Sequence, residues 1–139
     1  MVSSRELFDE LSFYTLAQPR PPFIHQLAID AFTAQRADES TKPMAVIFAL
    51  LGLYLHVEHN FTGLQVQEAH MRLARVPRSW PGLPLPRSRG MIEVSDVLAA
   101  EPGPARDAMI HAWCESVWQA WSESRQAIVE LVQRELGVG

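Results

Sequence analysis

The chain contains five histidines, the side chains whose usual pKa lies closest to neutral pH. A neutral imidazole can ligate a metal ion or move a proton there. His25, His56 and His70 fall in three separate predicted helices, each among apolar neighbours. One interpretation is three core histidines, each hydrogen-bonded to a carbonyl or to a neighbouring side chain, because buried polar groups normally have partners.

The alternative interpretation is a site for a divalent transition metal, such as zinc, inside a helical protein. Helical bundles build such sites from side chains on facing helices, and catalytic zinc takes three protein ligands and a water. His56 and His59 form a His-x-x-His pair that can face one ion from a single helix. His25 and His70 are the other candidate ligands. The zincin spacing is absent, so the pattern alone does not identify a zinc enzyme.

Geometry leaves the choice among these histidines open. His56 precedes a short predicted connection by about one helical turn, and His70 follows it by about two. Along the axes of the two predicted helices, the heights of these histidines therefore differ by roughly 6 Å. To share one ion, the helices would have to be tilted or the side chains would have to extend along the axes. A set of His25, His56 and His59 is equally compatible with the pattern. Asp30 or Glu58 could supply an oxygen ligand.

Two further patterns have a structural and a functional interpretation. Asp107, His111 and Cys114 share one side of the last predicted helix, which could activate a thiol. The position of Cys114 inside the helix favours a buried small hydrophobic residue instead. A face of small residues in the apolar helix indicates close helix packing or, alternatively, a groove for a small molecule that ends at His56; its members are Ala45, Ala49 and Gly52.

A positive patch is predicted in a proline-rich segment. Five of the twelve basic residues fall within eighteen positions that contain no acidic residue, namely Arg72, Arg75, Arg78, Arg87 and Arg89. In an acidic protein such a patch can bind an anion or an acidic partner. The alternative is a solvated loop. Trp80 is expected to hold this loop against the rest of the protein.

Composition and length predict one domain that covers residues 1–139. Apolar residues make up 47% and charged residues 20%, and the net charge is −4, so no nucleic-acid partner is expected. A single cysteine, an N-terminus without a signal-peptide pattern and apolar runs too short for a membrane span favour a cytoplasmic protein.

Helical periodicity predicts an all-α fold of five or six helices, arranged as a bundle. Helices are expected near residues 3–17, 22–36, 42–59, 62–76 and 95–100, followed by one long helix from Pro104 to about Leu136. The third segment is apolar on every side, so it is predicted to be the central element. Thr41 is expected to cap it. Residues 77–92 hold four prolines and are predicted to be irregular.

Several short stretches together resemble a small bacterial family known only as a domain of unknown function. They are YTLA at 14–17, PPFIHQ at 21–26, DAF at 30–32, GLYLHVE at 52–58, QVQEAHM at 65–71, SDVLAA at 95–100 and WC at 113–114. The resemblance covers nearly the whole chain and implies a free-standing domain. It implies no activity, substrate or cofactor.

Two functions remain open at this point. The first is a domain that binds a small molecule or a metal through its core histidines, as a binding protein or as an enzyme. The second is a non-catalytic module that forms homo-oligomers or docks a partner through aromatic and arginine-rich surface. Convergence of the histidines on a concave site would favour the first, and a flat apolar patch would favour the second.

Overall fold

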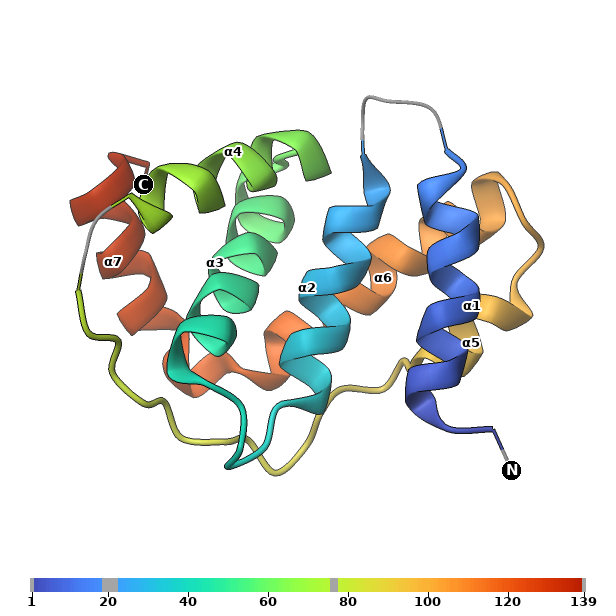
Figure 1. Ribbon diagram of the computed structural model, residues 1–139, viewed down its shortest axis with the longest axis horizontal. Coiled ribbons are helices and arrows are strands. Elements are labelled where there is room, and N and C mark those ends of the chain that lie inside the picture. Colours follow the sequence, from blue (N-terminus) through green and yellow to red (C-terminus); the bar gives the residue numbers. More distant parts are fainter. Residues whose placement is uncertain (1, 19–22, 76–77, 139) are drawn as a thin grey trace.

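The fold is known from a computed structural model that describes residues 2–18, 23–75 and 78–138. The described chain is all-α, with seven α-helices, one short 3-10 helix and no strand in these ranges (Figure 1). The elements are α1 (Ser4–Leu16), α2 (Ile24–Arg36), α3 (Pro43–His59), α4 (Gly63–Ala74), α5 (Val94–Ala99), α6 (Pro104–Ala120), η1 (Ser122–Ser124) and α7 (Arg125–Leu136). The all-α prediction is therefore confirmed, whereas the predicted count of five or six helices was too low.

Local sequence explains where most helices begin and end. Ser3 accepts a hydrogen bond from the Glu6 N–H at the start of α1, and Thr62 with Gln65 forms a full capping box at α4. The predicted cap of α3 was wrong. Lys42 occupies the N-cap position there, and the Thr41 hydroxyl instead accepts a hydrogen bond from the Asp38 N–H. The predicted helix ends at Pro22 and Val76 lie outside the described residues.

Helix α3 has the contacts expected of an element that is apolar all round. It packs against α2, α4, α6 and α7, and its leucines at 50, 51, 53 and 55 are fully buried. Figure 1 shows α3 between α2 and α7, with α4 crossing near its end. A segment with no polar face has no side that it can leave in water. The prediction that this helix contacts several others is confirmed.

The predicted single long C-terminal helix was wrong. α6 ends at Ala120, and the chain turns through Trp121 and η1 before α7 begins. A continuous helix over 104–136 would be about 50 Å long, which exceeds the width of a compact domain of this size. Trp121 fixes the turn, because its ring is buried and its Nε1–H donates to the Ala34 carbonyl of α2 at 3.2 Å.

The proline-rich segment that follows α4 is irregular where the structure describes it, as predicted. It runs along one edge of the molecule to α5 (Figure 1). Arg89 fastens it to the end of α2 by donating to the carbonyls of Gln35 and Ala37 at 3.0 and 2.7 Å. Gln35 in turn donates to the Arg89 carbonyl at 3.1 Å. None of the helices in the described ranges is long and apolar enough to span a bilayer.

Candidate functional site: a buried carboxylic acid between α2, α3 and α4

The histidines predicted to share an ion have different partners. His25 Nδ1 lies 2.8 Å from the Thr15 hydroxyl, which belongs to α1. His59 Nε2 lies 2.8 Å from the Tyr54 hydroxyl, one turn earlier in α3. His70 donates its Nε2–H to the Phe48 carbonyl at 2.7 Å. The structure therefore does not bring His25, His59 and His70 together.

His56 is paired with a histidine that the sequence analysis assigned elsewhere. Its Nδ1–H donates to the Phe61 carbonyl at 2.8 Å, so its Nε2 is left as an acceptor. His111 Nδ1 lies 2.8 Å from that atom and must donate to it. Burial, and then the nearby His56, lower the pKa of His111, with Asp107 opposing. The shift favours the neutral form of the His111 ring at pH 7.

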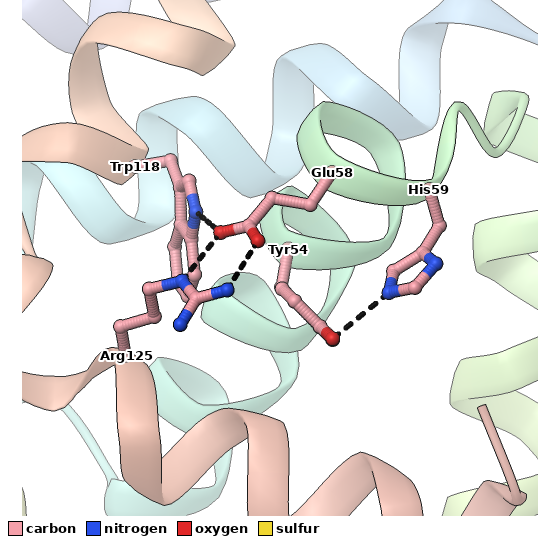
Figure 2. A network of polar contacts seen from close by, with 5 residues as sticks. All are labelled: Tyr54, Glu58, His59, Trp118 and Arg125. Atoms are coloured by element: carbon pink, nitrogen blue, oxygen red, sulfur yellow. Dashed lines mark hydrogen bonds and ion pairs between the residues drawn. The ribbon is translucent and has the colours of Figure 1, made fainter. Parts of the chain in front are cut away.

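A metal site at these histidines receives no support from this arrangement. Within residues 2–18, 23–75 and 78–138, no group of three or more histidine, cysteine, aspartate or glutamate side chains could hold a metal ion. Glu58 is already engaged by α6 and α7, as Figure 2 shows: it accepts from Trp118 Nε1 at 2.8 Å and forms an ion pair with Arg125. The zinc assignment stays a prediction, and elemental analysis of untagged protein tests it.

The side chains of Asp107, His111 and Cys114 share a helix but not a network. Tyr14 donates its hydroxyl to Asp107 at 2.6 Å, and His111 bonds His56. The Cys114 thiol is fully buried, and its contact with the Leu27 carbonyl is long, at 3.6 Å. Burial, together with the nearby Asp30, raises the pKa of this thiol. Cys114 is therefore an unreactive core residue, as the second interpretation expected.

The five arginines of the predicted positive patch have different roles. Arg89 is turned inward to backbone carbonyls, so it is not available to a partner. Arg78 forms an ion pair with Glu135 of α7 at 3.1 Å, and its guanidinium lies 5.5 Å from the centre of the Trp80 ring. Arg72, Arg75 and Arg87 are exposed. The patch that would bind an anion or a partner therefore stays a prediction for the four other arginines, without Arg89.

Asp30 is the polar residue of the core whose partners are incomplete. It lies in the middle of α2 and is only 3% exposed. Its Oδ1 accepts a hydrogen bond from Gln26 at 3.2 Å, one turn earlier in the same helix. Its Oδ2 is buried and has no hydrogen-bond partner among the described residues. His70 Nε2 lies 3.8 Å from Oδ2, which is too long for a hydrogen bond.

A glycine on the facing helix makes room for this carboxyl group. A Cβ atom built on Gly52 of α3 would lie 1.9 Å from Asp30 Oδ2 and 2.8 Å from its Cγ. Any side chain at residue 52 would therefore overlap the carboxyl group. The close packing predicted for the small-residue face of α3 is confirmed at Gly52, and the group packed there is an acid.

Burial decides the charge state of both members of this site. It raises the pKa of Asp30 well above the usual value of 3.8, against the opposing effect of the Gln26 hydrogen bond. It also lowers the pKa of His70 below 6.5, with the Phe48 carbonyl opposing. Burial thus favours the neutral carboxylic acid, which can donate a proton, at Asp30 and the neutral imidazole at His70. Since His70 Nε2–H faces the Phe48 carbonyl, its Nδ1 carries the lone pair.

The stretches that carry the family resemblance meet at this carboxyl group. Gln26, Asp30, Gly52 and His70 come from four of them and from three helices, and Asp30 influences the thiol of Cys114, which comes from a fifth, electrostatically. From the sequence, Asp30 was predicted only as an alternative metal ligand. Two features of the sequence could have indicated this site: an acidic residue in the middle of α2, Asp30, and a glycine in the middle of the apolar helix α3, Gly52.

Comparison with known proteins identifies a family without assigning an activity. No match was found among curated proteins or among solved structures. The family match covers residues 4–122, which include α1 to α6 and every residue of the Asp30 site. The chain belongs to DUF5946, a family of unknown function.

Proposed function

We propose that this chain is a helical bundle that binds a small polar molecule, with α3 as its central helix and with Asp30 and His70 as the groups that contact the ligand. The observation that carries the proposal is the buried Oδ2 atom of Asp30, which lacks a hydrogen-bond partner in the described ranges and lies 3.8 Å from His70 Nε2. Perturbed acids beside an imidazole are typical of functional sites.

Two unfavourable features coincide at this place, and a ligand would account for both. Leaving a buried polar atom unpaired costs about 1–3 kcal/mol. A glycine inside a helix costs about 1 kcal/mol relative to alanine. Gly52 nevertheless stands where it admits the carboxyl group of Asp30. A ligand that hydrogen-bonds to Oδ2 would remove the cost of the unpaired atom. It would also explain why a glycine stands at residue 52, since Gly52 leaves room for the carboxyl group that binds the ligand.

The side chain of His70 provides the route to the solvent, since it is 16% exposed whereas that of Asp30 is 4% exposed. The Phe48 ring of α3 packs beside the His70 ring, with 5.4 Å between the ring centres. A ligand that reaches Asp30 would therefore displace Phe48 or turn His70. Its head group would donate to, or accept from, a carboxyl group, as an amide, an amine or an imidazole does.

The test uses three small probes: acetamide, methylammonium and imidazole. We expect at least one of them to shift the nuclear magnetic resonance signals of the His70 ring in a saturable manner, because its head group would hydrogen-bond to Oδ2 beside that ring. The shift should disappear in Asp30→Asn and persist in the control Asp9→Asn, whose carboxyl group is on the surface of α1. No saturable shift with any probe up to about 50 mM, or an unchanged shift in Asp30→Asn, would contradict the proposal.

A second candidate function is an interaction module, and exposed apolar residues of α1 favour it. Phe13 is 83% exposed and Leu16 is 61% exposed, and both line one shallow depression with Asp9 and Ser12. Large apolar side chains gathered on a surface are typical of contact sites. Sedimentation velocity of the wild type and of Phe13→Ser separates the two functions, because only an interaction module that forms homo-oligomers would lose self-association in this variant.

A further inference from the structure

A small apolar cavity lies beneath the proline-rich loop, away from Asp30. Its volume is about 80 Å³, and it is enclosed by α3, the loop and α7. Its apolar walls include Ile47 of α3, Trp80 and Leu83 of the loop, and Ile128 and Leu131 of α7. Concave sites with apolar walls and a few polar groups are the usual form of small-molecule sites.

The charged residues that line this cavity are two arginines. Arg78 is held in place by its ion pair with Glu135 and by its position over the Trp80 ring. Arg134 also lines the cavity, and in the described part of the chain it has neither a hydrogen bond nor an ion pair. Two positive charges and one negative charge therefore lie around the opening. The net charge of −4 is distributed over the whole chain, and charges farther away than about 8 Å are screened at physiological ionic strength.

Size and charge together define the class of ligand. The cavity has about half the volume of the roughly 150 Å³ cavity that binds benzene, so its size suits an aliphatic chain of about three or four carbons. An unpaired guanidinium at the opening recognises a carboxylate by charge-assisted hydrogen bonds. We propose that this cavity binds a free short-chain carboxylic acid, with its chain against Trp80 and Leu131 and its carboxylate at Arg134.

This inference does not depend on the Asp30 site. The residues that line the cavity do not include Asp30, Gly52 or His70, although the Phe48 ring packs against both the Trp80 ring and the His70 ring, with ring centres 5.4 Å apart in each case. A ligand under the loop would contact Trp80 and leave Asp30 untouched. The two proposals can therefore succeed or fail separately.

The experiment titrates the protein with butyrate and with butyramide, its neutral counterpart, and follows the indole signal of Trp80 and the methyl signals of Leu131. We expect saturable binding of butyrate with a Kd below about 10 mM and at least fivefold weaker binding of butyramide, since charge-assisted hydrogen bonds are the stronger ones. Arg134→Gln should weaken butyrate binding by about fivefold or more. Arg87→Gln, an exposed loop arginine that does not line the cavity, is its matched control and should bind as the wild type does.

A second variant tests the position of the hydrocarbon chain. Ala127 lines the cavity but is exposed, so Ala127→Leu adds bulk at the opening without disturbing the core. We expect it to weaken butyrate binding about tenfold or more, whereas Gln126→Leu at the neighbouring exposed position should have no effect. Three results would each overturn the proposal: no saturable shift up to about 50 mM, equal affinity for butyramide, or wild-type affinity in Ala127→Leu.

Discussion

We expect the substitution Leu51→Ala to lower the free energy of unfolding by about 2–5 kcal/mol. Leu51 is fully buried in α3, the helix that packs against four others. Removing its side chain loses transfer free energy and leaves a cavity that the surrounding helices fill only partly. For a domain with roughly 5–15 kcal/mol of stability, this is a severe loss.

Denaturant unfolding at two protein concentrations measures this loss. Leu16→Ala is the matched control, because Leu16 is 61% exposed on α1, and the change should stay within about 0.5 kcal/mol. A loss below about 1 kcal/mol in Leu51→Ala, independent of protein concentration, would show that α3 is not buried among the other helices.

The second large effect is expected from Gly52→Ala, which should destabilise the protein by about 1–3 kcal/mol although alanine is the better helix former. The new Cβ would overlap Asp30 Oδ2, at 1.9 Å. Combining it with Asp30→Ala removes the overlapping atoms. The double variant should therefore be more stable than the sum of the two single losses predicts, by about 1 kcal/mol or more.

The rescue is expected to be incomplete, since the same Cβ also lies 3.0 Å from Val66 Cγ1. Gly82→Ala is the control for the glycine substitution, because its Cβ would meet nothing within 4 Å. Additivity of Gly52→Ala and Asp30→Ala within about 0.5 kcal/mol would mean that the two residues are not in contact.

Features that depend on neighbours along the chain could be predicted from the sequence. The caps of α1 and α4 are local motifs, and the irregular loop follows from prolines that cannot continue a helix. The contacts of α3 follow from its apolar residues, since such a helix must be covered on all sides.

Features that depend on contacts between helices could not be predicted. Gly52 was interpreted as a site of close helix packing, and nothing in the pattern of α3 indicates that the group opposite is a carboxyl group of α2. His56 was paired with nearby histidines, whereas its partner His111 lies in α6. The turn at Trp121 depends on a carbonyl of α2, so the helical periodicity of residues 104–136 gave no sign of it.

The candidate site requires Asp30 to be a neutral acid in the folded protein. Its pKa is raised by burial in the folded state, from the usual value of 3.8 that applies when the chain is unfolded. The folded state therefore holds the proton more tightly. The stabilisation that this gives is fully present below about pH 3.8 and is lost as the pH rises through the folded pKa.

The most direct test compares the free energy of unfolding of the wild type and of Asp30→Asn between about pH 4 and pH 7. Titrations of groups remote from Asp30 occur in both proteins and largely cancel, and His70, whose Nε2 lies 3.8 Å from Asp30 Oδ2, is the exception in this pH range. We predict that the wild type loses stability relative to Asp30→Asn as the pH rises, by up to about 1.4 kcal/mol per pH unit. A constant difference, or a relative gain by the wild type with rising pH, would mean that Asp30 is charged and has a partner, and would contradict the proposed site.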